Sequence, residues 1–389
     1  MKRYLILILL VPAILILQAC LSEAGLIKTG AENMQDYIPL IRGKVIGLVA
    51  NQTSTVKNRH LADTLLSLGV DIGVIFAPEH GFRNMADAGE IITDGKDPVT
   101  GIPLISLYGN HLKPTSEDLK GIDYVIFDIQ DVGARFYTYI STMHYVMEAC
   151  AENKVKLIIL DRPNPNGFYF DGPVLDTAYK SFVGMDPVPV VHGMTVGEYA
   201  TMINNEGWLN NGERCNLIVI RCSGYNHQKY YELPVKPSPN LPNQTSVYLY
   251  PSLCFFEGTP FSCGRGTRFP FQAFGDPKMP DEGFNFIPES LPGAKNPPRL
   301  GLKCFGTDLR NAISDGIVPV AGLNLSWIIN AYSKYPDKEK FFIPYFDVLA
   351  GGPQLREQIQ KGMTENEIKA TWKEGLTQFG KIRAKYLLY

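Results

Sequence analysis

The chain has 389 residues, of which 45% are hydrophobic and 20% are charged, and its formal net charge is −2. This composition is ordinary for a globular protein with a large core, and the length suggests about two domains. The charge is too close to neutral for a polyanion-binding surface, so we do not expect nucleic acid as a partner.

The first twenty residues have the features of an export signal that ends in a lipid-attachment site. Two basic residues, Lys2 and Arg3, are followed by the uncharged apolar stretch 4–17. The segment 17–20 (LQAC) then resembles a lipobox, in which the cysteine becomes the first mature residue. We therefore predict a signal peptide over residues 1–19.

Acyl chains on Cys20 would hold the mature protein stably at a membrane surface. With residues 20–40 as anchor and linker, we expect an exported lipoprotein of the cell envelope, anchored in the outer membrane and facing the periplasm. The alternative is an ordinary cleaved signal in which Cys20 is incidental. The sequence leaves the oligomeric state open.

Six short apolar runs between residues 43 and 223 alternate with stretches of helical spacing. The runs are rich in Val, Ile and Leu without strict alternation, as expected for strands covered on both faces. The predicted strands are residues 44–50, 71–77, 104–108, 123–128, 156–160 and 216–221, and the predicted helices are 61–68, 137–153 and 196–206. The last helix should begin with a capping box at Thr195 and Glu198. This alternation predicts a Rossmann-like, mostly parallel, doubly wound sheet over residues 41–240.

Polar clusters follow four of the predicted strands. They begin where each strand should end, at residues 51–53, 78–81, 130–135 and 161–165. Ligands of open α/β sheets bind outside the carboxyl ends of the strands, near the point where the strand order reverses. We therefore expect a binding site at this edge of the sheet.

The usual cofactor and nucleophile motifs are missing from this edge. No Gly-x-Gly-x-x-Gly follows the first strand, and the chain has no Walker loop, zincin helix or Gly-x-Ser-x-Gly elbow. The six later cysteines show no metal-ligand or redox spacing. Whether Cys215 pairs with Cys222, or Cys254 with Cys263, is not decided by the sequence. We expect neither a cofactor nor a metal ion.

The character of the sequence changes after about residue 235. The Pro-rich segment 237–242 is a stiff connection, and a Gly/Arg loop follows at 264–267. Helical patterns return at residues 322–335, 353–361 and 365–379. We predict a smaller α+β domain over residues 241–389, whose Gly/Arg loop reaches back toward the sheet edge.

Several separated motifs are specific enough to indicate a family. They are residues 77–83 (APEHGFR), 127–139 (FDIQDVGARFYTY), 160–165 (LDRPNP), 191–195 (VHGMT), 237–240 (PSPN), 257–259 (EGT) and 264–267 (GRGT). In this order, they resemble the exo-β-N-acetylmuramidases of the NamZ type, and the resemblance extends from about residue 40 to the end. Two positions depart from the expected pattern: Asn84 replaces a glycine, and Cys263 replaces a glutamate or another polar residue.

The resemblance implies a Rossmann-like catalytic domain followed by an auxiliary domain. It also implies an exo-acting glycoside hydrolase. Such an enzyme releases N-acetylmuramic acid (MurNAc) from the non-reducing end of peptidoglycan fragments in which MurNAc alternates with N-acetylglucosamine (GlcNAc). The catalytic glutamate of the family maps onto Glu79.

A glycosidase needs a carboxylic acid that protonates the leaving oxygen and a second group that stabilises the reacting sugar or activates water. We expect Glu79 to be the acid, with His80 beside it. For the second group, Asp131 and Asp161 compete with the 2-acetamido oxygen of the substrate. Asp128 competes as well.

Three of the acidic candidates also have structural interpretations. Asp128 ends an apolar strand and could hold Arg135 or Arg162 in place. Glu90 lies on a loop that could fold over the site, and Glu257 is similar, although we expect a structural role for Glu257.

MurNAc differs from GlcNAc by a 3-O-lactyl group whose carboxylate suits the bidentate fork of arginine. We expect Arg135 to bind it, because a helix should start directly after Arg135 and add backbone donors. A structural pair with an aspartate is the alternative. Tyr137 and Tyr139 could form an aromatic sugar platform. The other residues expected to bind substrate are Arg83, Asp128, Gln130, Arg162, Asn164, His192, Asn240 and Arg265.

Two other functions remain open from the sequence. One is an envelope amidase or esterase with His80 or His192 as base, although no Ser or Cys stands in the setting of a nucleophile. The other is a non-catalytic lipoprotein that binds muropeptides at the same edge.

Overall fold

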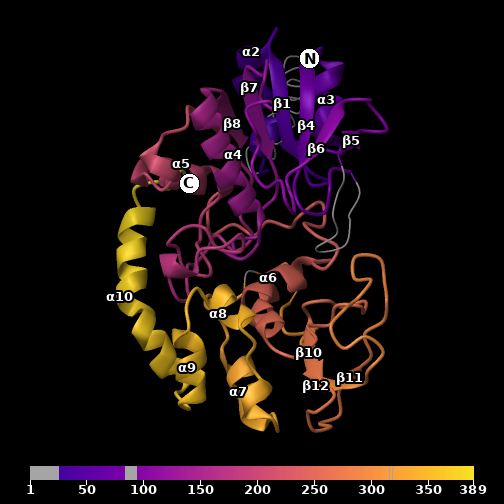
Figure 1. The fold of residues 1–389 in the computed structure, drawn as a ribbon, viewed down its shortest axis with the longest axis vertical. Helices are drawn as coiled ribbons and strands as arrows, with labels where there is room; N and C mark the ends of the chain where they lie inside the picture. Colours follow the sequence, from indigo (N-terminus) through magenta and orange to yellow (C-terminus); the bar gives the residue numbers. More distant parts are fainter. Residues whose placement is uncertain (1–25, 84–93, 315, 318) are drawn as a thin grey trace, which may run out of the picture.

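The computed structural model of the protein describes residues 26–83, 94–314, 316–317 and 319–389. They form two parts that meet along the lower edge of a large sheet (Figure 1). The long helix α10 (Glu365–Arg383) runs from the second part back to the first, so that the C-terminus lies near α5 (Val196–Glu206).

A seven-stranded sheet forms the first part, in the order β5-β6-β4-β1-β7-β8-β9. Six strands are parallel and the edge strand β5 is antiparallel to β6. The strands are β1 (Val45–Ala50), β4 (Asp71–Ala77), β5 (Gly95–Lys96), β6 (Pro103–Ser106), β7 (Tyr124–Asp128), β8 (Lys156–Leu160) and β9 (Leu217–Ile220). After β1 the chain adds β4 and β6 on one side of this strand, and then β7, β8 and β9 on its other side. The strand order therefore reverses at β1, and the switch point lies where β1, β4 and β7 end. The predicted doubly wound α/β sheet is confirmed.

Alternation along the strands places an apolar layer on each face of the sheet. In β1, Ile46 and Leu48 belong to the core cluster that includes residues of α2 and α3, whereas Val49 belongs to the cluster that includes α4 and α5. The helices and the small hairpin of this part are α2 (Met34–Ile41), α3 (Leu61–Ser67), α4 (Tyr139–Asn153), α5, β2 (Thr55–Val56) and β3 (Arg59–His60). The capping box of α5 is present as predicted.

The second part combines short helices with a small antiparallel sheet, which confirms the predicted α+β character. Its elements are α6 (Gln244–Leu253), α7 (Ser326–Lys334), α8 (Tyr345–Ala350), α9 (Gln354–Gln360), α10, β10 (Ala273–Asp276), β11 (Asn285–Phe286) and β12 (Cys304–Asp308). Both parts of the protein also contain short 3-10 turns, which are η1 (Gly30–Glu32), η2 (Thr177–Tyr179), η3 (Asn210–Gly212), η4 (Cys254–Gly258) and η5 (Lys338–Lys340). Phe255, Phe346 and Trp372 share one core cluster with α4 and α5, so the two parts are packed together. The boundary at residue 240 stays a prediction.

The described residues give two further findings, one on membrane-spanning helices and one on disulfide bonds. None of the helices there is both long and apolar enough to cross a membrane. The six cysteines from Cys150 to Cys304 are buried free thiols, so neither of the disulfides that the sequence left open is formed.

A buried ionic cluster fixes α4 to the loop before α5. The ring of His144 lies 3.1 Å from Asp186 and 3.3 Å from Glu148, Tyr199 donates to Asp186, and Lys113 pairs with Glu148. Burial by itself lowers the pKa of His144, but the hydrogen bonds to the two carboxylates outweigh it and raise that pKa to about 9.

The raised pKa of His144 predicts an alkaline loss of stability. A folded-state pKa above the unfolded value near 6.5 gives stability that is complete below about pH 6.5 and lost as the pH rises through about 9. We expect a loss of roughly 1–3 kcal/mol over this interval. Thermal unfolding between pH 6 and pH 10 measures it, with His144→Gln as the control whose alkaline slope should be flatter. Equal slopes for the two proteins would contradict the prediction.

Candidate active site

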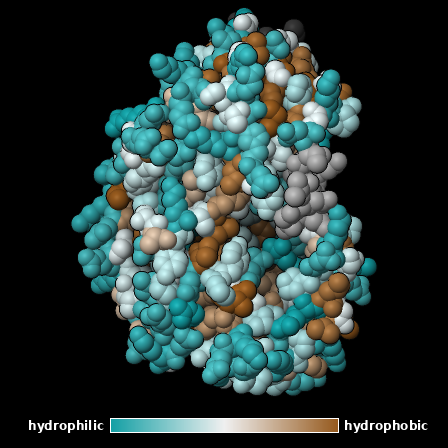
Figure 2. Space-filling view, in the orientation of Figure 1, coloured by the Kyte–Doolittle hydropathy of each residue, from teal (hydrophilic) through white to brown (hydrophobic). Residues whose placement is uncertain are grey.

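A pocket lies where the two parts meet, at the carboxyl ends of the central strands, and Figure 2 shows a hollow in this face of the molecule. The pocket opens to solvent and contains side chains from two distant stretches of the chain. Both parts contribute to it. Its described lining residues include Glu79, Tyr108, Thr138 and Phe182 from the first part and Asn240, Tyr250, Glu257, Arg265 and Tyr345 from the rest of the chain.

One wall of the pocket carries Glu79, on a tight turn that follows β4. The backbone NH of Gly81 donates to the carbonyl of Pro78 at 3.0 Å, and His80 has a left-handed φ of 72°. A non-glycine residue in this region costs about 1–3 kcal/mol, and such strain is concentrated at functional sites. The turn therefore places Glu79 and His80 in the pocket at an energetic cost.

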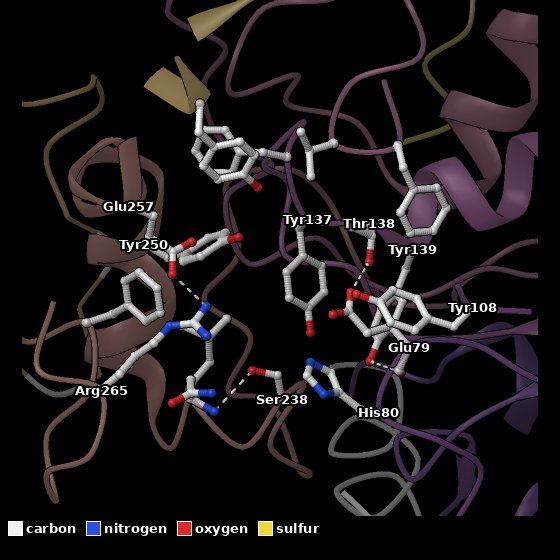
Figure 3. A pocket seen from close by; sticks show the side chains of 17 residues that line it. Glu79, His80, Tyr108, Tyr137, Thr138, Tyr139, Ser238, Tyr250, Glu257 and Arg265 are labelled. Carbon is white, nitrogen blue, oxygen red and sulfur yellow. Dashed lines mark hydrogen bonds and ion pairs between the residues drawn. The ribbon is translucent and has the colours of Figure 1, made fainter. Parts of the chain in front are cut away.

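Two hydroxyl groups hold the carboxylate of Glu79. Thr138 Oγ1 donates to Glu79 Oε2 at 2.9 Å (Figure 3). The second hydroxyl group is that of Tyr108, which is hydrogen-bonded to Glu79. Burial, the charge of Glu79 and this hydrogen bond raise the pKa of Tyr108 to about 12, so the hydroxyl keeps its proton at neutral pH. Glu79 is thus fixed in direction while it remains half-buried at the pocket surface.

The opposite wall carries an arginine and a second carboxylate. Arg265 Nη2 lies 2.6 Å from Glu257 Oε1, and its guanidinium lies over the ring of Phe271 at 5.4 Å. Its Nε is buried and has no hydrogen-bond partner among the described residues. Figure 3 shows this pair across the pocket from Glu79. Within the described lining, Arg265 is the one Lys or Arg and Glu257 the one carboxylate besides Glu79.

Tyr137 and Tyr139 both line the pocket. Both are buried and pack edge to face at 4.9 Å. The hydroxyl of Tyr137 donates to the carbonyl of Pro237 at 2.8 Å, and that of Tyr139 lies 3.4 Å from the same oxygen. Their hydroxyl groups thus contact the Pro-rich connection, and the aromatic sugar platform stays a prediction. Asn240, on this connection, does line the pocket and donates to the carbonyl of Gly293 at 2.9 Å.

Asp128 and Arg162 form a buried pair outside the described pocket lining. The two bonds from Arg162 to Asp128 measure 2.6 and 2.8 Å, and both side chains are almost fully buried. The expectation that they bind substrate is corrected in favour of the structural alternative for Asp128, which holds Arg162.

Asp161 is also structural in this arrangement. It is fully buried and accepts hydrogen bonds from the NH of Gly197 and from the hydroxyls of Thr195 and Tyr389, at 2.7–2.8 Å. Burial raises its pKa to about 6, against the opposing effect of these bonds. Because its donors come from the chain itself and it does not line the pocket, we no longer place it in catalysis.

Asp131 and three neighbours brace the loops behind the pocket. Asp131 accepts from the NH of Gly133 at 2.6 Å and lies 3.4 Å from His192 Nε2. The amides of Gln130 and Asn164 donate to backbone carbonyls. All four are buried and outside the described lining, so the catalytic role expected for Asp131 and the substrate contacts expected for the other three are corrected to a supporting role.

The two other arginines are engaged elsewhere. Arg135 is fully buried and donates to the carbonyls of Pro173, Val188 and Leu349, and α4 begins at Tyr139, not directly after Arg135. Arg83 pairs with Asp63 and Asp97. Neither lines the pocket, which corrects the expectation that Arg135 receives the lactyl carboxylate.

Some residues proposed from the sequence lie outside the described residues, and some residues that line the pocket were not proposed from the sequence. Glu90, Asn84 and Cys20 lie outside the described residues. Sequence reasoning missed Tyr108, Thr138, Phe182 and Tyr250, and it gave Glu257 a structural role. The signal for Glu257 was present in its motif, EGT, which precedes the GRGT motif of Arg265. Among the described residues, no group of three or more His, Cys, Asp or Glu side chains is placed to hold a metal ion.

The structural role of Asp161 gives a prediction. In Asp161→Asn the hydroxyls of Thr195 and Tyr389, which donate to the carboxylate, have to accept from the amide NH₂ instead, so we expect a loss of about 1–3 kcal/mol in stability. The kcat of the folded variant should match the wild type, since the side chain does not reach the pocket. Thermal unfolding and steady-state kinetics on one preparation measure both. A large fall in kcat at unchanged stability would return Asp161 to the catalytic candidates.

Fold and pocket together define a two-part α/β protein whose cleft offers carboxylate, cation and aromatic side chains, the set with which sugar-acting enzymes hold their substrates. Residues 46–245 match the N-terminal domain, and residues 248–389 the C-terminal domain, of the family described as exo-beta-N-acetylmuramidase NamZ. The chain belongs to this family.

Relatives agree over nearly the whole length. The peptidoglycan beta-N-acetylmuramidase NamZ of Bacillus subtilis (strain 168) is 38% identical over 385 residues, which cover 93% of this chain and 91% of that protein. Two crystal structures of DUF1343 family proteins from Bacteroides fragilis NCTC 9343 are similar over 93% of this chain and 99% of theirs. One has 47% identity and a TM-score of 0.87, and the other has 29% identity and a TM-score of 0.80.

Proposed function

We propose that this protein is an exo-acting glycoside hydrolase that releases MurNAc from the non-reducing end of peptidoglycan-derived MurNAc–GlcNAc fragments. Its membership of the NamZ family and the name of its Bacillus subtilis relative support the reaction and the substrate class. The observation that carries the proposal is the placement of Glu79 across the pocket from Arg265.

In this reaction Glu79 donates a proton to the glycosidic oxygen as the bond from that oxygen to the anomeric carbon of MurNAc breaks. Thr138 and Tyr108 hold the carboxyl group in direction. GlcNAc leaves with the transferred proton on its hydroxyl group. Water then supplies the hydroxyl group of the released MurNAc, and its remaining proton returns the carboxylate of Glu79 to the acid form.

Arg265 takes over the role that the sequence suggested for Arg135. One end of its guanidinium is held by Glu257, and 22% of the side-chain surface stays exposed at the pocket. The lactyl carboxylate of MurNAc can bind at this exposed part, which gives a charge-assisted hydrogen bond that GlcNAc cannot form. Glu257 then positions Arg265, and the second catalytic group is a choice between Glu257 and the 2-acetamido oxygen of the substrate.

An amidase or esterase is less well supported. Cys254 and Cys263, near Arg265, have their thiol pKa values raised well above the usual range by burial, so neither forms the thiolate that a nucleophile requires. Ser238 lines the pocket, but its hydroxyl accepts from the backbone NH of Asn240 at 3.2 Å and stands between two prolines, not in an elbow.

Product analysis on a defined MurNAc–GlcNAc disaccharide tests the proposal. Release of free MurNAc and GlcNAc supports the glycosidase, and release of peptide or acetate from natural muropeptides supports the alternative enzyme. Saturable binding without turnover between acid and neutral pH would identify a binding lipoprotein instead. Activity should survive dialysis against a chelator, since we propose no metal ion in the reaction.

We further propose that Cys20 carries a lipid and that the mature protein lies at the periplasmic face of the outer membrane. The support is the sequence of residues 2–20, with its basic start, apolar run and lipobox. Fractionation of cells that express the full chain tests this. The wild type should be in the membrane fraction and Cys20→Ser in the soluble fraction, and equal distribution of the two would refute lipidation at this residue.

A further inference from the structure

We propose that Phe182 is the platform for the leaving sugar, so that this residue determines the preference for a GlcNAc on the reducing side of the cleaved bond. The inference rests on the proposed function and adds a second sugar position to it. Phe182 belongs to none of the sequence motifs of the family resemblance.

Phe182 stands at the tip of a two-residue turn. Ser181 and Gly184 exchange both backbone hydrogen bonds, at 2.9 and 3.0 Å, which leaves Phe182 and Val183 between them. Both tip residues line the pocket and are half-buried. The turn therefore presents an aromatic ring at the pocket without burying it.

The ring belongs to a row of half-buried aromatic side chains. Its centroid lies 6.2 Å from that of Tyr108, and 6.4 Å from that of Tyr145 with an angle of 17° between the planes. Tyr108, Phe182 and Tyr145 are all partly exposed, in contrast to the buried rings of Tyr137 and Tyr139. Aromatic faces that remain accessible are suited to the apolar faces of sugar rings.

The row lies on the side of the pocket where the leaving group must be. Tyr108 is hydrogen-bonded to Glu79, and Figure 3 shows both on the side opposite Arg265. If the lactyl carboxylate is bound at Arg265 and the glycosidic oxygen at Glu79, the sugar on the far side of that oxygen meets Tyr108 first and then Phe182. A leaving GlcNAc therefore stacks on the Phe182 turn.

Arg135 and His144 hold the segments on either side of this turn before any substrate binds. Arg135 donates to the carbonyls of Val188 and Pro173 and to that of Leu349 in α8, and a Cβ atom built on Gly184 would lie 3.5 Å from Arg135 Nε. Asp186, two residues after Gly184, is paired with His144 of α4. The segments that flank the turn are thus fixed to both parts of the protein, and a platform fixed in advance loses little conformational entropy on binding.

Steady-state kinetics of Phe182→Ala on the MurNAc–GlcNAc disaccharide, with inhibition by the methyl glycoside of GlcNAc and by free MurNAc, test the inference. Loss of one stacked ring should raise the KM for the disaccharide about tenfold and weaken inhibition by the GlcNAc glycoside by a similar factor. Inhibition by MurNAc should stay within about twofold of the wild type. Phe182→Tyr keeps a ring and should restore the wild-type KM.

Phe168→Ala is the matched control, because Phe168 is equally half-buried but lines a different pocket. Its kinetics should equal those of the wild type. The inference is overturned if Phe182→Ala keeps the wild-type KM, or if it weakens MurNAc and the GlcNAc glycoside equally. Failure of the proposed function has another signature: the wild type itself would release no MurNAc from the disaccharide.

Discussion

Glu79→Gln should lower kcat on the MurNAc–GlcNAc disaccharide by at least about two orders of magnitude, because general-acid assistance typically contributes about 10²–10⁴-fold. Glutamine keeps the length of the side chain and an oxygen that accepts from Thr138, but it has no acidic proton to give. Glu79 is half-buried and is not part of the core clusters, so the melting temperature should stay within a few degrees. Kinetics and thermal unfolding of the same preparation separate the two effects.

A second substrate sharpens the test of Glu79. Aryl glycosides of MurNAc with an activated phenol leave without much protonation, so the loss in kcat for Glu79→Gln should be much smaller on them. Asp161→Asn, another carboxylate-to-amide change, serves as the control that should keep kcat. Near-normal turnover of Glu79→Gln on the disaccharide would reject the assignment. Glu257 would then be the next candidate, since the structure buries Asp131 and Asp161 outside the pocket.

The sequence was sufficient for the sheet and for Glu79. Strands covered on both faces give continuous apolar runs, and the residue after such a run lies at the carboxyl edge of a parallel sheet. Glu79 directly follows Pro78 at the end of β4, next to the switch point, so its position followed from local pattern. The family resemblance then assigned its chemistry.

Local pattern did not separate structural from functional charges. Arg135 and Arg265 both stand in Gly-containing loops, and the role of Arg135 depends on carbonyls far along the chain. Arg135 donates to the carbonyl of Leu349, 214 residues away, and lies outside the pocket lining, whereas Arg265 lines the pocket beside Glu257. Asp161 likewise accepts a hydrogen bond from Tyr389, which is 228 residues away. Such partners are set by tertiary packing, which no window of the sequence contains.

Arg265→Ala should lower kcat/KM for MurNAc substrates by about 10–150-fold, the value of a lost hydrogen bond to a charged group at about 1.5–3 kcal/mol. The loss should depend on the lactyl charge. A disaccharide in which the lactyl carboxylate is converted to the carboxamide has nearly the same shape and lacks the charge, so on it the variant should differ from the wild type by only a fewfold. The loss in kcat/KM on the carboxylate substrate, divided by the loss on the carboxamide substrate, gives the part that depends on the lactyl charge.

Arg265→Ala also removes the guanidinium that lies 2.6 Å from Glu257. The carboxylate of Glu257 that loses this partner could disturb the pocket even without any loss of substrate contact. Arg265→Lys keeps the positive charge beside Glu257 and loses the planar fork, so it should lie between the wild type and Arg265→Ala on the natural substrate. The double variant Arg265→Ala/Glu257→Gln removes the unpaired charge and should still discriminate poorly between carboxylate and carboxamide. If Arg265→Ala loses the same factor on both substrates, its contribution is structural, and the lactyl carboxylate must be bound by another group. If only the carboxylate substrate suffers, Arg265 is the residue that distinguishes MurNAc from GlcNAc.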